Sequence, residues 1–214
     1  KDVATGRGAY SFCMCPGGHV IASSSEEGGV VTNGMSDYAR NSGIANSALV
    51  VTVNPKDFSS ADCLAGVAFQ RQWERKAFEC GGKNYQVPAQ SVREFLRGEV
   101  SGRFRLLPSY RPGYRPVDLH TILPAEIGEV LGRAILFFDG KVNGFAGEEA
   151  TLSGIESRTS APVRIMRDDS GQTLNFRGLF PAGEGAGYAG GITSSAVDGL
   201  KTAQKLSMLY APME

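Results

Sequence analysis

The sequence lacks long hydrophobic runs and a net charge. The longest unbroken apolar run is Ala134–Phe138, which is far shorter than the roughly 18 residues that a membrane helix requires. The 22 Lys and Arg residues balance the 22 Asp and Glu residues, so no overall field attracts the chain to nucleic acid or to an anionic membrane. We therefore predict a cytoplasmic protein without a nucleic-acid partner or a membrane partner.

Cysteine and histidine are also scarce. The four cysteines are Cys13, Cys15, Cys63 and Cys80. Their spacing does not match a secreted disulfide framework, and no Cys and His set completes a zinc site, so we expect reduced thiols and no metal. The C-x-C pair lacks the C-x-x-C spacing of thioredoxin-like sites. A structural role is therefore favoured for Cys13 and Cys15, and a redox role stays open as the alternative.

Glycine, in contrast, is abundant, with 28 residues in 214, and it indicates many turns or close backbone approaches. The first part of the chain alternates short β-prone runs with turns, and Leu49–Val53 predicts a buried strand. Helices are predicted from Ser59 to Cys80, over Ala89–Arg97, and after Pro124. Cys63 and Cys80 fall within or beside the first of these helices, and we expect both in the core.

The last third predicts strands over residues 151–157, 163–167 and 177–181, followed by a terminal amphipathic helix. Ile192, Ala196, Leu200 and Ala203 form the apolar face of this helix. Six of the fourteen residues from Gly178 to Gly191, the glycine segment, are glycine. This succession of strand, glycine-rich turn and helix is the most specific chemical feature of the sequence.

Gly185–Gly190 matches the pattern G-x-G-x-x-G, in which backbone N–H groups and a helix N-terminus hold phosphate. A dinucleotide-binding motif of this type opens a βαβ unit with a second strand and an acidic residue about twenty positions on. Only 24 residues follow Gly190, and they are predicted to form one helix. An ordinary dinucleotide-binding motif is therefore excluded at this position.

The string from Gly178 to Gly199 resembles the C-terminal flavin-binding segment of FAD oxidoreductases with two dinucleotide folds. Further strings are similar to the largely uncharacterised bacterial FAD-dependent dehydrogenase family, which belongs to the NAD(P)/FAD-dependent oxidoreductases. These strings are Phe12–Gly18, Ser25–Gly28, Val31–Ser36 and Glu156–Arg164. The resemblance covers nearly the whole chain.

This resemblance implies a mixed α/β (α+β) fold, with a substrate-side domain over residues 1–150 and the C-terminal part of an FAD-binding domain over residues 151–214. It also implies non-covalent FAD, with NAD(P)H as a possible electron donor, and a small-molecule substrate of unknown identity. The residues implied at the cofactor are Gly183, Glu184, Gly185, Gly190, Gly191, Ile192 and Thr193. Arg158 is the candidate for substrate binding, and an ion pair is the alternative role for it.

One expected part of the family pattern does not precede Lys1: the strand, G-x-G-x-x-G turn and helix that hold the FAD pyrophosphate. We therefore expect a fragment, inactive and poor in flavin by itself, whose partner is the missing N-terminal Rossmann domain of the same polypeptide. The alternative from another class is a non-catalytic module that binds a small anionic ligand or a protein partner.

Overall fold

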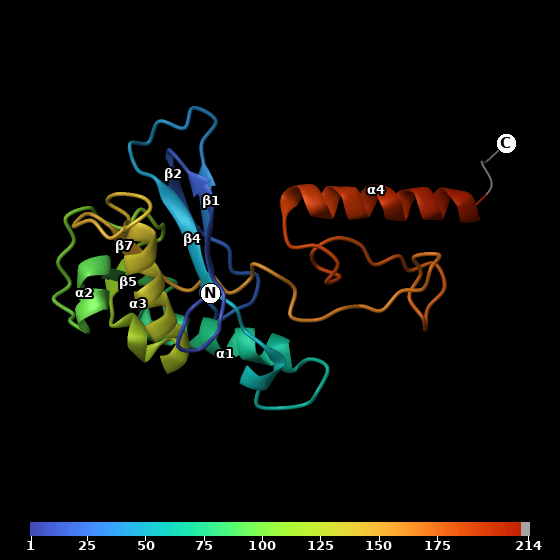
Figure 1. Cartoon of the computed structure of the whole chain (residues 1–214), viewed down its shortest axis with the longest axis horizontal. Coiled ribbons are helices and arrows are strands. Elements are labelled where there is room, and N and C mark those ends of the chain that lie inside the picture. Colours follow the sequence, from blue (N-terminus) through green and yellow to red (C-terminus); the bar gives the residue numbers. More distant parts are fainter. Residues whose placement is uncertain (211–214) are drawn as a thin grey trace. The chain divides into compact units, whose positions relative to one another are not determined.

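The computed structural model describes residues 1–210 and has a mixed α/β fold, which confirms the predicted class. It divides into two compact units (Figure 1). Unit 1 comprises Lys1–Asp57 and Phe69–Ser157, and unit 2 comprises Phe58–Ala68 and the chain from Arg158 onward. Residues 151–157, which open the second predicted domain, thus belong to unit 1.

Two antiparallel strand pairs make up the first part of unit 1. Strand β1 (Ala9–Cys15) pairs with β4 (Asn46–Val51), and β2 (Gly18–Ala22) pairs with β3 (Thr32–Ser36). The predicted strand at Leu49–Val53 therefore exists, shifted by two or three residues toward the N-terminus. The β1–β4 register shifts between Phe12 and Cys15, which is a β-bulge.

A three-stranded sheet lies at the centre of unit 1. Strand β5 (Val87–Ser91) pairs in parallel with β6 (Tyr114–Pro116) and antiparallel with β7 (Thr151–Ser153). Because β5 is paired on both edges, all five of its residues are buried. The prediction of a helix from Ala89 onward was therefore wrong for its first three residues, where sheet pairing outweighs local helix preference.

The helices of unit 1 follow from their end signals. In α2 (Val92–Arg97), the Ser91 side chain accepts a hydrogen bond from the Glu94 N–H, and Gly98 ends the helix with a left-handed φ of 66°. Helix α3 (Ala125–Asp139) follows Pro124 as predicted. Helix α1 (Ala65–Cys80) begins six residues after Ser59, since the Asp62 carboxylate accepts a hydrogen bond from the Leu64 N–H and forms a turn before the helix.

The core of unit 1 gathers apolar side chains from its sheet, its helices and the connecting segments. Its buried members are Val30, Ala77, Val87, Ala89, Val92, Phe95, Tyr110, Leu119, Ile122 and Ile135. Cys80 packs against this core and is partly buried, but Cys63 is exposed, so the prediction of a core position was wrong for Cys63. Cys63 precedes α1 instead of lying within it. Within residues 1–210, no helix is both long and apolar enough to span a bilayer.

Unit 2 contains one long helix, α4 (Ile192–Leu209), preceded by irregular chain. The predicted strands at 163–167 and 177–181 do not form, and the described residues show only an isolated bridge between Arg167 and Thr173. A strand requires a continuous hydrogen-bonded ladder with a neighbour. Within residues 1–210 these segments make only isolated backbone contacts, such as the hydrogen bonds Ile165 N–H to the Ala186 carbonyl and Thr173 N–H to the Leu179 carbonyl.

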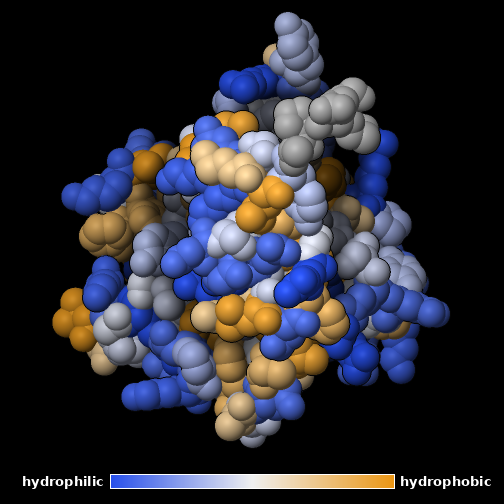
Figure 2. Space-filling view, turned by 90° about the vertical axis from the view of Figure 1, so that its right-hand side faces the viewer, coloured by the Kyte–Doolittle hydropathy of each residue, from blue (hydrophilic) through white to orange (hydrophobic). Residues whose placement is uncertain are grey.

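Helix α4 turns a polar face toward its own unit. Thr202 is its buried residue, and Ser195, Asp198 and Lys205 on the same side are partly buried. The predicted apolar face (Ile192, Ala196, Leu200 and Ala203) is exposed instead, with Ile192 at 90% and Leu200 at 68%. Figure 2 likewise shows orange apolar side chains at the surface among hydrophilic ones. The prediction of a helix was correct, but its apolar face does not pack into a core of unit 2.

Candidate functional site

An ion pair fixes the glycine segment to helix α4. Arg167 Nη2 lies 2.6 Å from Asp198 Oδ1, and Arg167 Nη1 donates to the carbonyl oxygen of Pro181 at 2.8 Å. The Gly183 N–H donates to Asp198 Oδ2 at 2.8 Å. The Arg167 guanidinium, helped by this N–H, lowers the pKa of Asp198 to about 2 and is itself raised in pKa by the carboxylate. Asp198 therefore remains an anion that joins the backbone of the glycine segment to helix α4.

Two glycines with left-handed backbone shape the turn that follows. Gly183 has a φ of 72° and Gly187 a φ of 82°, a region that glycine enters without steric cost. The Tyr188 N–H donates to the Gly183 carbonyl oxygen at 3.0 Å. The Tyr188 ring lies under the Arg167 guanidinium, 3.7 Å from its central carbon. The turn is thus closed by its own backbone and covered by the same arginine that pairs with Asp198.

Two strings that are far apart in the sequence lie side by side at this turn. The Ile165 N–H donates to the Ala186 carbonyl oxygen at 3.2 Å, and Arg164 Nε donates to the Gly187 carbonyl oxygen at 3.0 Å. A Cβ atom on Gly187 would collide with the Val163 backbone. The structure therefore brings the Glu156–Arg164 string, in its second half, against the glycine segment.

Six of the seven predicted cofactor residues are exposed or partly buried, whereas Gly183 is buried and its N–H is already donated to Asp198. Glu184 is partly buried, and its carboxylate has no hydrogen-bond or ion-pair partner among residues 1–210. A Cβ atom on Gly185 would meet nothing within 4 Å. Gly190 and the residues at the start of α4, where Gly191 is the N-cap, are exposed. Ile192 and Thr193, the last two of the predicted cofactor residues, are both exposed in the first turn of α4.

Ser195 is a site residue that the sequence analysis missed. Its Oγ atom is buried and has no hydrogen-bond partner in the part of the chain that the structure describes. A Cβ atom on Gly183 would lie 3.7 Å from the Ser195 Cβ, so this hydroxyl sits in the first turn of α4 against the glycine turn. A serine three residues after a predicted helix start was the available signal, but this position is common for serine in helices without a ligand.

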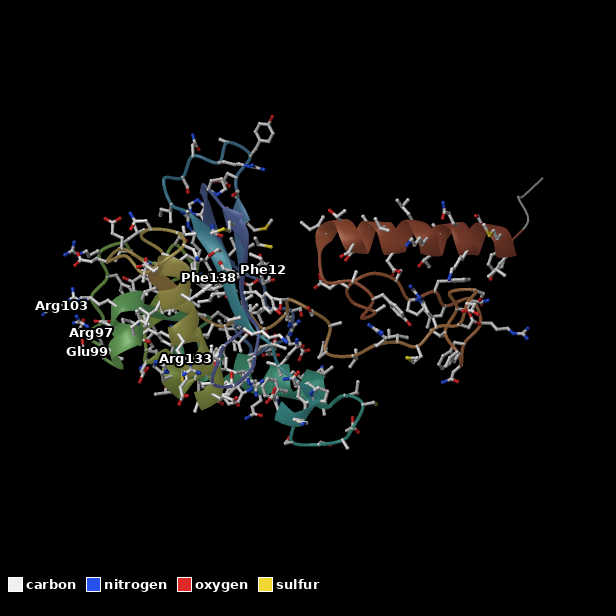
Figure 3. The ribbon with its side chains drawn as sticks, in the orientation of Figure 1. Phe12, Arg97, Glu99, Arg103, Arg133 and Phe138 are labelled. Atoms are coloured by element: carbon white, nitrogen blue, oxygen red, sulfur yellow. The ribbon has the colours of Figure 1, made fainter. Side chains whose placement is uncertain are left out.

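Arg158 differs in its surroundings from the arginine-rich segment, which is Arg93–Arg115 and contains six arginines. Arg158 is partly buried at the start of the second part of unit 2 and is engaged in an interaction within the structure. Around α2, Arg97 and Arg103 are exposed and point outward (Figure 3). Arg105 pairs with Glu148 at 2.5 Å on the surface. The arginine-rich segment therefore presents solvated charge.

Comparison with known proteins places the chain in a family. Residues 1–159 match the family described as "FAD-dependent protein, C-terminal domain-like". An uncharacterised protein of Clostridium beijerinckii is 52% identical over 201 residues, which are 94% of this chain and 38% of that protein. The chain thus spans well under half the length of this relative, whose match extends beyond residues 1–159. The chain therefore belongs to the family described as "FAD-dependent protein, C-terminal domain-like".

Proposed function

We propose that the chain is part of an FAD-dependent oxidoreductase that transfers hydride to or from a small organic substrate. Family membership supports the association with FAD. The observation that carries the proposal for unit 2 is the Glu184 carboxylate, left without a partner beside the turn that Asp198 and Arg167 close. A carboxylate that no side chain or N–H of residues 1–210 engages is available to a ligand, and hydroxyl groups of a bound ligand would donate hydrogen bonds to it.

The residues at this turn fit the chemistry of a flavin nucleotide. Glu184 would accept hydrogen bonds from ribityl or ribose hydroxyls. Gly185 and Gly190 leave room for the flat or polar parts of the cofactor to approach the backbone. The start of α4 presents the positive end of its dipole, and Ser195 has a buried hydroxyl to donate. FAD, when bound, supplies the hydride-transfer chemistry.

We propose residues 1–150 as the substrate-side domain of the enzyme. Arg158 is the residue proposed to hold an anionic group of the substrate, because a guanidinium binds carboxylates in a bidentate manner. Its partly buried position reduces competition from water. NAD(P)H is the proposed electron donor.

The apolar face of α4 supports a further part of the proposal: that the rest of a longer polypeptide packs on unit 2. Ile192 and Leu200 are far more exposed than apolar residues on one helix face normally are. More than half of the Clostridium relative lies outside the matched region. We propose that the flavin-pyrophosphate domain occupies this additional length and covers the α4 face.

Hydrogen exchange in the presence of FAD tests the proposal. A longer family protein that contains this sequence should bind FAD and show slower exchange of the amides at residues 183–193 when FAD is added. The 214-residue chain alone should purify colourless and show little protection, because it would lack the pyrophosphate contacts. The arginine-rich segment around Arg97 and Arg103 serves as an internal control whose exchange should not change.

Two results would contradict the proposal. Stoichiometric FAD in the purified 214-residue chain would refute the need for a further domain. A longer protein that folds, as judged by circular dichroism, yet neither binds FAD nor protects residues 183–193 would favour the non-catalytic binding module.

A further inference from the structure

We propose that Cys13 and Cys15 form a redox-active dithiol that exchanges with small-molecule disulfides. Cys15 is the last residue of strand β1, and Cys13 directly follows Phe12, which is labelled in Figure 3. Both are free thiols; Cys13 is exposed and Cys15 is partly buried. This inference does not rest on the proposed flavin function, because every group that it uses lies in unit 1.

The spacing of the two residues in β1 brings their Cα atoms within the range of a disulfide. Residues two apart on a strand have Cα atoms about 6.6 Å apart, within the range of roughly 4.4–6.8 Å seen for disulfides. The register with β4 resumes only at Cys15, so Cys13 and Met14 have no ladder partner. Cys13 also has a left-handed φ of 50°. The backbone at Cys13 is therefore outside the ladder, whereas Cys15 is paired with β4.

A buried polar group without a partner lies across the ladder from Cys15. Asn46 on β4 is the Cα partner of Cys15, and directly opposed residues of an antiparallel pair project to the same face. Both the Oδ1 and the Nδ2 atoms of Asn46 are buried and without a hydrogen-bond partner among residues 1–210. A buried amide left unpaired is unusual and costly. Asn46 Nδ2 makes no hydrogen bond to any acceptor of residues 1–210, sulfur included, so we infer that a shift of this side chain lets an N–H donate to the Cys15 sulfur once that sulfur is a thiolate.

Glycine makes room for this asparagine. A Cβ atom on Gly34 of β3 would collide with Asn46 Oδ1, so the amide lies directly against the Gly34 backbone. The Ser36 Oγ atom, two residues farther along β3, is likewise buried without a partner in the described chain. Polar atoms from two different strand pairs are thus buried without a hydrogen-bond partner among the described residues, and one of them, on Asn46, lies opposite Cys15.

The exchange proceeds in two balanced steps. The exposed Cys13 thiolate attacks a disulfide RS–SR, which breaks the S–S bond, forms a Cys13–SR mixed disulfide and releases RS⁻. The Cys15 thiolate then attacks the Cys13 sulfur, which forms the Cys13–Cys15 bond and releases the second RS⁻. The protein loses two electrons and RS–SR gains them, and the two thiol protons end on two RSH molecules. Asn46 acts as a positioning residue for the second step.

Redox titration with glutathione, followed by alkylation and mass spectrometry, tests this inference. The Cys63→Ser, Cys80→Ser double variant leaves only the proposed pair, and it should titrate as one two-electron couple with a mass loss of about 2 Da. Cys15→Ser should accumulate a glutathione mixed disulfide at Cys13. Cys13→Ser should react more slowly, since Cys15 is less exposed. Oxidation that yields only mixed disulfides at every glutathione ratio would overturn the proposal.

The role of Asn46 has its own readout. Asn46→Ala should slow conversion of the mixed disulfide to the Cys13–Cys15 bond by about fivefold or more, because the thiolate loses a hydrogen-bond donor worth about 1 kcal/mol. Asn41→Ala, which changes an exposed asparagine, is the matched control and should leave the rate unchanged. Equal conversion rates in folded Asn46→Ala and wild-type protein would contradict the role of Asn46.

Discussion

At the scale of single residues, one aspartate organises unit 2. Asp198 accepts hydrogen bonds from Arg167 and from the Gly183 N–H, and the two ion-paired side chains are only 15–16% exposed. Thr202, one turn later, donates its hydroxyl to the Asp198 carbonyl oxygen. This network replaces the apolar core that the helix does not build in its own unit. The shape of the glycine turn therefore depends on a charge.

Asp198→Asn should loosen the glycine turn without unfolding unit 1. The variant keeps the shape of the side chain and removes its charge, so the Gly183, Gly187 and Tyr188 amides should exchange about five- to thirtyfold faster, equivalent to about 1–2 kcal/mol. Amide hydrogen exchange measures this change. Asp169→Asn, at an exposed carboxylate without a partner among residues 1–210, is the control. Equal exchange in both variants would show that the ion pair does not hold the turn.

The difference in amide exchange between wild type and Asp198→Asn should depend on pH. The pKa of Asp198 is lowered from 3.8 to about 2 in the folded protein, so its stabilising contribution is present above the unfolded value and is lost as the pH falls toward the folded value. The difference in exchange between wild type and Asp198→Asn should be constant from about pH 7 to 5 and shrink between about pH 4 and 2. A constant difference down to pH 2 would contradict this account.

At the scale of elements, the sequence predicted the helices better than the strands. Helices α3 and α4 carry their signals locally, in Pro124 and in the glycines before Ile192. Strand β5 could not be predicted, since it depends on β6 and β7, which come from distant parts of the chain. The predicted strands at 163–167 and 177–181 did not form for the converse reason: β-prone residues form no strand where they make only isolated hydrogen bonds in place of a continuous ladder. The predicted apolar face of α4 is exposed in unit 2, because periodicity defines an apolar face but not its partner.

A pair of identical substitutions tests the exposed face of α4. Ile135→Ala, at a fully buried position on α3, should destabilise unit 1 by about 2–5 kcal/mol. Ile192→Ala, at a position that is 90% exposed, should change stability by no more than about 0.5 kcal/mol in the 214-residue chain. In a longer family protein the same Ile192→Ala should cost about 1–2 kcal/mol, because the proposed domain buries this side chain.

Denaturant unfolding with hydrogen exchange for each unit measures these differences. The exchange data assign each loss of stability to unit 1 or to unit 2. A substitution at Ile192 that stays neutral in the longer protein would show that the rest of the polypeptide does not cover this face.

At the scale of the whole molecule, the two units carry different parts of the account. The family match covers residues 1–159, which include all of unit 1, whereas the candidate flavin residues lie in unit 2. The sequence placed Glu184 and its glycines correctly in one turn before a helix. It could not show that residues 160–165 pack on that turn or that Ser195 points into it, since both depend on contacts between segments far apart in the chain.

The most direct test of the central claim is a flavin titration of a longer family protein and its Glu184→Ala variant. Loss of a charge-assisted hydrogen bond, worth about 1.5–3 kcal/mol, should raise the Kd for FAD by about ten- to a hundredfold. Far-UV circular dichroism of the apoprotein should stay unchanged. Glu149→Ala, at an exposed glutamate of unit 1, should bind FAD like the wild type. Equal Kd values for wild type and Glu184→Ala would contradict the account.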